Sequence, residues 1–297
     1  MLFKQAQLFS LNKTLPTQLS SLLPKLEPLT FKTCPPSFAS SHGWVAPTKD
    51  KDTPLVYSMG HYLLFSLQFE EKVLPSGVIK KELENKISEL QQKEDRKVYA
   101  KEKKNLRDEV TMTLLPRAFT QISQIYALVD TKRQWLITNS LQADKVKALT
   151  LSFKKCFDVD ITPLKLKKIS YLLTEWVKKN DAPENIEILD QCFLQDPNVM
   201  KRTIRSQSQS LSSPPLQALI DSGLEVKQLL LSWQEAVRFT LTDFMHLKNL
   251  RYTDEALADV EDDATESALD RFNTDFVMMV KTLDPLFLTL TENFVGE

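Results

Sequence analysis

The sequence predicts an α/β fold of the α+β type, in which antiparallel sheets and helices occupy separate stretches of the chain. Three patterns favour it: runs of strand-like alternation, one hairpin pattern with its turn, and long stretches with apolar residues at helical spacing. The chain has 297 residues, of which 42% are hydrophobic. A length of this kind suggests about two domains, and the composition is sufficient to bury a core.

The predicted strands begin in residues 1–74, where apolar runs alternate with joints rich in proline and serine. The clearest is the run HYLLFSLQF at 61–69, which predicts a buried strand and with it a sheet. Residues 122–139 alternate and then turn through 130–134, a pattern typical of a hairpin. Alternation at 237–242 predicts a further strand with one polar face.

The first predicted helix follows Pro75, with Ser76 as its N-cap. Its apolar positions are Ile79, Leu83, Ile87 and Leu90. From 91 to 105 almost every residue is polar or charged, so this stretch is either an exposed helical arm or a charged loop.

Further helices are expected at 142–157, at 170–179 and over the last forty residues. In the last of these, Pro285 should kink or split the helix, because proline lacks the amide hydrogen of the i→i−4 bond. Apolar residues spaced by threes and fours mark it: Leu269, Phe272, Phe276, Met279, Leu283, Phe287, Leu290 and Phe294.

These patterns divide the chain into four parts. We expect a sheet-containing central region from residues 1–74 and 110–180, and a charged helical arm at 75–109. A second sheet-containing region, which forms a tip, should cover 181–252, and acidic helices should occupy 253–297.

The sequence lacks the motifs that are typical of several classes of function. The five glycines are too scattered for the turns that hold nucleotide phosphates, and no GxSxG elbow is present. The three cysteines and three histidines form no zinc-type pair, so we expect no zinc site of this kind and no cofactor. Isolated thiols, and a start that lacks a long apolar run, predict a cytoplasmic protein without a membrane segment.

One acidic cluster keeps a catalytic alternative open. It consists of Asp259, Glu261, Asp262 and Asp263. Carboxylates can hold a hard cation for phosphodiester chemistry, but this cluster lacks the glycine and the spacing of a calcium loop. A solvated helix junction is the other interpretation, and a metal-dependent nuclease remains a rival function.

Charge is unevenly distributed along a chain whose net charge is only −1. Nine lysines against three acids give 145–179 a net charge of +6, whereas twelve acids against two basic residues give 253–297 a net charge of −10. A nearly neutral protein can bind a polyanion only if such charges are segregated in space.

A lysine stripe is predicted within the arm, where ten basic residues in 80–107 oppose six acids. If the arm is helical, the spacing i, i+4, i+8 and i+11 places four lysines on one face. They are Lys93, Lys97, Lys101 and Lys104. The stripe could follow a phosphate backbone, or it could be a solvated face neutralised by Glu94, Asp95 and Glu102.

Six strings of the sequence together resemble one family, the recombination-associated protein RdgC of proteobacteria. They keep their order over some 240 residues. The strings are GWVAP (43–47), EEKVLPSGVIKKELENKI (70–87), RDEVTMTLLPRAF (107–119), LTEWV (173–177), LLLSWQ (229–234) and RFNTDFVMM (271–279).

The resemblance implies a DNA-binding protein without known enzymatic activity. It also implies a curved multi-domain subunit. Two such subunits would pair through two contacts into a ring-shaped homodimer around duplex DNA. Members of the family bind without sequence preference and restrain strand exchange by RecA. Such a protein would be associated with the nucleoid, and single-stranded DNA remains open as a further ligand.

The resemblance also assigns roles to two residues. Phe119 matches an aromatic residue that helps to close one subunit contact, and Gln209 lies where the family has its other contact, at the tip. The match at Gln209 is weaker, because Ser206, Gln207 and Ser208 stand where the family has basic residues.

The sequence and the resemblance lead to one functional hypothesis and one alternative. Lys93, Lys97, Lys101 and Lys104 are expected to contact phosphates, with Arg117 as a weaker candidate because it could instead pair with an acid near the interface. No helix-turn-helix or zinc-finger signature would deliver side chains to base edges, so contact with the backbone alone is expected. The alternative is a regulator that contacts the recombinase directly through the acidic C-terminal surface.

Overall fold

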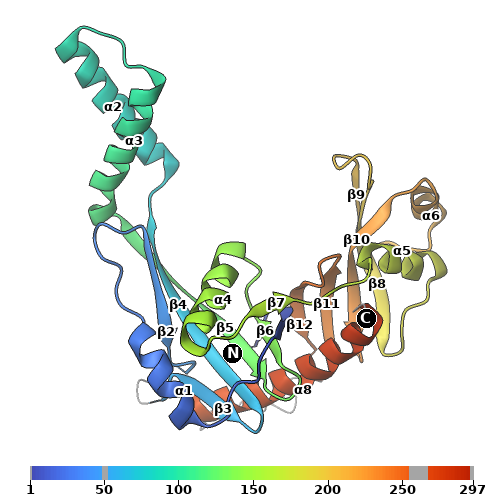
Figure 1. Cartoon of the computed structure of the whole chain (residues 1–297). Helices are drawn as coiled ribbons and strands as arrows, with labels where there is room; N and C mark the ends of the chain where they lie inside the picture. Colours follow the sequence, from blue (N-terminus) through green and yellow to red (C-terminus); the bar gives the residue numbers. More distant parts are fainter. Residues whose placement is uncertain (1, 49–52, 254–266, 295–297) are drawn as a thin grey trace.

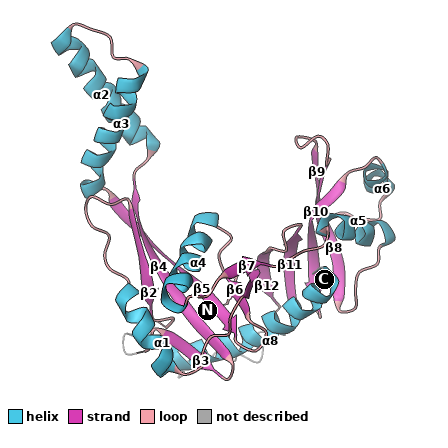
Figure 2. Cartoon of the chain, viewed as in Figure 1, coloured by secondary structure: helices cyan, strands magenta, loops and turns pink. Residues whose placement is uncertain are grey.

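The computed structural model describes residues 2–48, 53–253 and 267–294. Within these residues the chain forms seven α-helices and two antiparallel sheets (Figures 1 and 2). The α+β prediction is confirmed at this level. The helices are α1 (Leu19–Leu26), α2 (Ser76–Glu94), α3 (Ala100–Leu114), α4 (Ala143–Phe157), α5 (Ile169–Lys179), α6 (Pro214–Asp221) and α8 (Ala268–Phe294), with 3₁₀ turns η1 (Glu27–Leu29) and η2 (Leu115–Arg117).

The first sheet has the strand order β2-β4-β5-β6-β1-β7, and β3 also pairs with β4. Its strands are β1 (Gln7–Leu11), β2 (Ser40–Val45), β3 (Val56–Met59), β4 (Tyr62–Val73), β5 (Phe119–Asp130), β6 (Trp135–Thr138) and β7 (Ile161–Pro163). β4 and β5 pair along their full lengths, from Tyr62 opposite Asp130 to Val73 opposite Phe119. The predicted strand at 61–69 and the predicted hairpin of β5 and β6 are both confirmed.

Both faces of the first sheet are buried along its middle. Leu63, Phe65 and Leu67 alternate with Leu64 along β4, and all four are fully buried. The first three pack in a cluster with α1 and α4, while Leu64 packs in the cluster that contains α8. Because successive side chains of a strand point to opposite faces, one apolar run supplies both cores.

The second sheet has the order β12-β11-β10-β8-β9. Its strands are β8 (Ile186–Gln195), β9 (Thr203–Ser206), β10 (Glu225–Trp233), β11 (Val237–Thr242) and β12 (Leu247–Tyr252). β11 coincides with the predicted strand at 237–242. One face of the sheet buries Leu229, Leu231, Phe239 and Leu241 against a core that α5, α6 and α8 share.

The two sheets are joined at the N-terminus of the chain. Ala6 exchanges two backbone hydrogen bonds with Leu247 of β12, at 2.9 and 2.8 Å, and the Leu250 amide donates to the Lys4 carbonyl at 2.9 Å. The residues before β1 therefore continue the edge of the second sheet.

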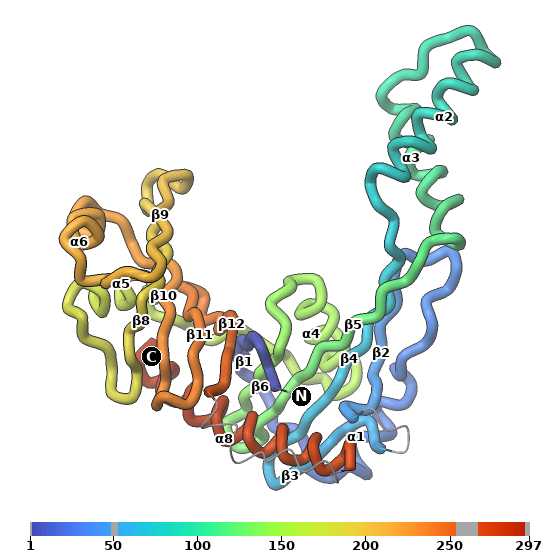
Figure 3. Tube along the Cα trace, turned by 180° about the vertical axis from the view of Figure 1, so that it is seen from behind, coloured from blue at the N-terminus to red at the C-terminus, as the bar shows by residue number. Residues whose placement is uncertain are grey.

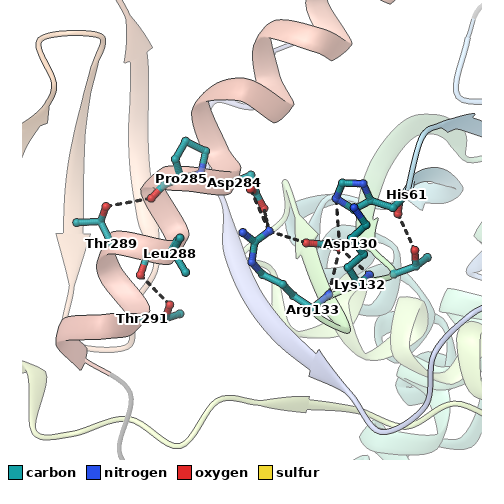
Figure 4. Close-up of polar contacts among 10 residues, drawn as sticks. His61, Asp130, Lys132, Arg133, Asp284, Pro285, Leu288, Thr289 and Thr291 are labelled. Carbon is teal, nitrogen blue, oxygen red and sulfur yellow. Dashed lines mark hydrogen bonds and ion pairs between the residues drawn. The ribbon is translucent and has the colours of Figure 1, made fainter.

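Helix α8 runs beneath both sheets (Figures 1 and 3). Near its start Phe276 packs edge-on against Tyr57 of β3, and at its end Phe294 packs against Trp176 of α5, each with ring centroids 5.0 Å apart. Between them Arg133 Nη1 donates to Asp284 at 2.8 Å and to Asp130 at 2.9 Å (Figure 4). One helix thus contacts residues from 57 to 176.

Pro285 does not split α8, so that part of the prediction is wrong. The helix continues because Leu283, Leu286, Phe287 and Leu290 on either side of the proline are fully buried. The loss of one backbone hydrogen bond is smaller than the free energy of burying this apolar face. The prediction of several acidic helices is tested only for 267–294, which holds this one helix, because 254–266 lie outside the described residues.

The N-cap prediction at Ser76 is also wrong, since Ser76 is the first residue of α2 and Pro75 is the cap. The Pro75 carbonyl accepts the first bonds, from the amides of Val78 and Ile79 at 3.0 and 3.3 Å. The two predicted helices that follow β6 and β7 are confirmed as α4 and α5.

The ribbon views show how these parts are arranged. The α2–α3 pair projects beyond the ends of β4 and β5, away from the second sheet (Figures 1 and 3). β9 and α6 lie at the opposite end of the molecule, and α4 lies between the two ends. The arm and β9 rise on the same side of α8.

Candidate nucleic-acid interface

The arm is a hairpin of two helices. α2 ends at Glu94, and Asp95 takes a left-handed conformation with φ of 46°, after which the chain folds back into α3. The hairpin buries Val98, Leu106 and Val110, and the Lys86 ammonium bridges α2 to Glu109 of α3 at 2.6 Å. The arm is therefore helical, as one of the two sequence alternatives stated.

The four lysines do not share one helix face, so the predicted stripe is wrong in its geometry. Lys93 belongs to α2, Lys97 to the connection, and Lys101 and Lys104 to the start of α3. The reason is the reversal at Asp95, which lets α3 bury its apolar side against α2. The fold instead gathers all four lysines around the outer end of the hairpin, where each is exposed.

Arg96 forms ion pairs with two acids at this end of the arm. Its guanidinium donates to both carboxylate oxygens of Glu102, at 2.8 and 2.7 Å, and its Nε donates to Glu94 at 2.6 Å. The hydrogen bond from Arg96 lowers the pKa of Glu102, and the bonds to Glu102 and Glu94 raise the pKa of Arg96. A planar guanidinium is suited to such two-point contacts.

Arg96, and none of the four lysines, forms the ion pairs with these two acids. Among the described residues, none of the four forms an ion pair, and Lys103 beside them is likewise exposed and unpaired. Glu94 and Glu102 thus pair with Arg96 rather than with these lysines, and the alternative of a solvated face that also holds Asp95 is not decided by these contacts. We call Lys93, Lys97, Lys101 and Lys104 the arm-tip lysines.

Arg117 and Phe119 lie where the arm returns to the sheet. Arg117 ends η2 and is exposed, and it forms no ion pair within the described residues. Phe119 opens β5 with 88% of its surface exposed, opposite Val73, which is 44% exposed. Ile122, three residues along the same strand and therefore on its other face, is 61% exposed. Large apolar side chains that share an exposed strand pair form a surface suited to a protein partner.

Gln209 lies at the other end of the molecule, between β9 and α6, and its side-chain amide donates to the Ser206 hydroxyl at 2.8 Å. It lines a hollow on the second sheet together with Arg238 and Arg251. The sequence analysis placed Arg238 on a polar face but did not single out either arginine. Their meeting depends on the β11–β12 register, which pairs Arg238 with Arg251.

Many lysines of the basic segment 145–179 are paired with acids in the folded chain. Five of its nine lysines form ion pairs: Lys145 with Glu71, Lys154 with Asp158 and Asp160, Lys168 with Glu225, Lys178 with Asp221, and Lys179 with Glu175. Three of these acids, Glu71, Asp221 and Glu225, come from outside the segment. The fold thus removes much of the excess that the sequence indicated.

The acidic cluster of Asp259, Glu261, Asp262 and Asp263 lies outside the described residues. In the part of the chain that is described, no group of three or more histidine, cysteine or acidic side chains could hold a metal ion. No helix among the same residues is long and apolar enough to cross a bilayer.

Comparison with known proteins shows sequence similarity over the whole length of this chain. A family model described as "Putative exonuclease, RdgC" matches residues 1–297. A recombination-associated protein RdgC from Pseudomonas fluorescens (strain Pf0-1) is 30% identical over 300 residues, which cover 100% of this chain and 98% of the relative. The protein of the same name from Pasteurella multocida (strain Pm70) is 33% identical, with 99% and 98% covered.

Proposed function

The chain belongs to the RdgC family, and from that premise we propose that it binds duplex DNA without sequence preference and modulates recombination by RecA. The observation that carries the proposal is the electrostatic arrangement at the end of the arm. Arg96 takes up Glu94 and Glu102, and the arm-tip lysines are left as unpaired cations. Unpaired lysines bind phosphates with release of counterions and without reading the bases.

The proposed assembly is a ring-shaped homodimer of curved subunits around the duplex. Phe119, exposed opposite Val73, would bury its ring in the partner at one contact, and Gln209 would take part in the second. Two separate self-complementary patches are what a closed twofold ring requires. Phe119 lies in the first sheet, whereas Gln209 lies in the connection between β9 of the second sheet and α6.

The further parts of the proposal follow from the family. The protein would act in the cytoplasm on the nucleoid, with the arm of residues 75–109 contacting DNA and Arg117 adding a contact at its base. The central region would comprise 1–74 and 110–180, the tip region 181–252 and the acidic region 253–297. Restraint of RecA would arise from occupation of the duplex that RecA uses.

The experiment that tests the DNA contact reverses the arm-tip charges. A variant with all four arm-tip lysines changed to Glu should lose duplex binding at about 100 mM salt, where wild type binds. The wild-type constant should fall with salt at a log–log slope of about −0.9 per phosphate contacted. The matched control changes four exposed, unpaired lysines elsewhere, Lys25, Lys32, Lys132 and Lys281, to Glu.

Each outcome has a defined meaning. If the arm variant binds like the control, the residue assignment is wrong. If wild-type protein binds no DNA but binds recombinase, the alternative of a protein-only regulator replaces this proposal.

We also propose that binding proceeds without cleavage. The description of the matching family model contains the word exonuclease, so the point needs a direct assay. End-labelled linear duplex incubated with the protein and Mg²⁺ should remain intact over hours. Stepwise shortening of the label would establish a nuclease instead.

A further inference from the structure

The outer face of the second sheet is open and polar, in contrast to its buried face. A hollow of about 800 Å³ lies on it, next to a smaller one of about 160 Å³. The two share Gln191, Leu230, Thr240 and Asn249 as lining residues, so they form one continuous depression across β8, β10, β11 and β12. We call this depression the sheet trough. A concave site lined by a few converging polar groups is the usual form of a ligand site.

Arginines stand at both ends of the sheet trough. Arg238 and Arg251 are cross-strand partners at one end, and Arg205 lies at the other with its guanidinium 5.9 Å from the centre of the Phe193 ring. None of the three forms an ion pair within the described residues. Asp190 is the single carboxylate among the lining residues of the described chain.

The Arg238–Arg251 pair is unfavourable as it stands. Like charges directly opposite each other on neighbouring strands destabilise a sheet, and neither arginine forms an ion pair with an acid of the described residues. An anion bound between the two guanidinium groups would remove the repulsion. Guanidinium groups bind phosphate by two-point hydrogen bonds, so a phosphate is well matched to this end of the trough.

The floor between the arginines carries side chains with unused hydrogen-bonding groups. Gln191, Gln228, Asn249 and Thr240 each form no side-chain hydrogen bond with another described residue. Amides and hydroxyls of this kind both donate and accept, as base edges do. Phe193 adds a half-buried aromatic ring, on which a base can stack when the Arg205 guanidinium that lies over the ring moves to a phosphate.

We propose that the sheet trough binds single-stranded DNA, with the three arginines on phosphates, the amides on base edges and Phe193 beneath a base. A duplex hides its pairing edges inside the helix, whereas a single strand exposes them to such a floor. From β9 to β12 the sheet spans four strand intervals, about 19 Å, which is enough for several nucleotides. This inference rests on the proposed function, but it assigns a second surface separate from the arm. Gln209, which the proposed function places at the second subunit contact, is one of the residues that line the trough.

The test compares a single strand with a duplex on the same protein. A fluorescent oligo(dT) of about 15 nucleotides, within the range of known single-strand sites, and a duplex of equal length are titrated with wild type and with Arg238→Gln/Arg251→Gln. The double variant should bind the single strand at least tenfold more weakly. Its salt slope should fall by about 1.4, since each phosphate contact contributes about 0.7 on single strands.

Two further variants separate the trough from general charge loss. The control Lys132→Gln/Lys281→Gln removes the same charge from exposed, unpaired residues and should bind the single strand within twofold of wild type. Phe193→Leu retains the charge and most of the volume, and should weaken single-strand binding about tenfold through lost stacking. Duplex binding should be unchanged in all three variants.

Several results would overturn the inference. These are unchanged single-strand binding in the arginine variant, an equal loss for single strand and duplex, or a changed oligomeric state of the variant. Competition by polyglutamate as effective as that by oligo(dT) would show a general polyanion surface and would also overturn it. Failure of the arm variant to lose duplex binding bears on the proposed function alone.

Discussion

At the scale of single residues, Arg96 determines which acids of the arm are paired. Its three nitrogen atoms bind Glu94 and Glu102, which would otherwise lie among the arm-tip lysines. Both acids and the arginine lie on the surface, so the ion pairs themselves contribute little to stability. Their effect is on the field that the lysines present to a ligand.

A substitution at Arg96 should therefore weaken DNA binding by more than the loss of one charge. Arg96→Gln releases two acids that can pair with the lysines, and exposed ion pairs of this kind are worth about 0.2–1 kcal/mol each. We expect duplex affinity to fall about fourfold further than in Lys103→Gln, which removes one exposed, unpaired charge of the same arm. Anisotropy titrations at constant salt measure both, and equal losses would contradict this account.

Glu225 is the residue through which pH should affect stability. It forms ion pairs with Lys168 and Lys227 at 2.9 and 3.0 Å and accepts a hydrogen bond from Ser170 at 2.9 Å. Desolvation alone raises the pKa of Glu225, but these contacts outweigh it and hold the pKa at about 2. Since this value lies below that of the unfolded chain, the stabilisation is complete above about pH 4.5 and is lost as pH falls toward 2.

The variant Glu225→Gln should lower the free energy of unfolding at pH 7 by about 2 kcal/mol, the scale of hydrogen bonds to a charged group. The difference from wild type should shrink as pH falls below about 4.5. Urea unfolding followed at several pH values measures it. Glu187→Gln, an exposed position on the neighbouring strand, is the control and should stay within about 0.5 kcal/mol.

At the scale of elements, the arm is an insertion between two paired strands. Val73 and Phe119 are the last cross-strand partners of β4 and β5, and the buried arm residues Val98, Leu106 and Val110 belong to neither main hydrophobic cluster. The sheet therefore closes without the arm, which places the arm-tip lysines far from the cores that support them.

Replacement of residues 74–118 by Asn-Gly should leave the sheets folded, because this dipeptide forms the two-residue turn that joins antiparallel strands. Circular dichroism and thermal unfolding should resemble those of wild type, while duplex affinity should fall to the level of the lysine-to-Glu variant. A shortened protein that kept wild-type duplex affinity would place the contact elsewhere.

Helix α8 has the opposite relation to the cores. It has 27 residues, and its buried side chains include Phe272, Phe276, Leu283 and Phe287. These pack in one cluster with residues of both sheets and of helices α5 and α6. The buried face explains why Pro285 is tolerated, and Arg133, bound to Asp284 and Asp130, fixes the helix to the β5–β6 turn (Figure 4). Helix α8 thus packs against both sheets.

At the scale of the whole molecule, the proposed ring makes a topological prediction. A closed ring cannot slide off a covalent circle, so wild-type protein should be retained on closed circular DNA longer than on linear DNA of equal length. Phe119→Ala should weaken one subunit contact and bring retention on circles down to the linear value.

The control for this prediction is another exposed phenylalanine. Phe244 is 70% exposed on the β11–β12 turn, and Phe244→Ala should retain circles as wild type does. Equal retention of circular and linear DNA by wild-type protein would remove the case for encirclement.

The sequence by itself determined the local elements and the family. The strand at 237–242 and the helices α4 and α5 agree with their predicted ranges, because alternation and helical spacing are properties of neighbouring residues. The likeness of six strings to the RdgC family also required only their order, and the family match extends over residues 1–297.

Only the tertiary structure decided which charges remain unpaired. The reversal at Asp95 turned one predicted lysine stripe into a cluster at a hairpin end, and Arg96 took the acids beside it. The β11–β12 register brought Arg238 to Arg251, while Glu71, Asp221 and Glu225 neutralised lysines of the basic segment. Ion pairs require side chains within about 4 Å, and chain folding sets that distance between residues that lie far apart in the sequence.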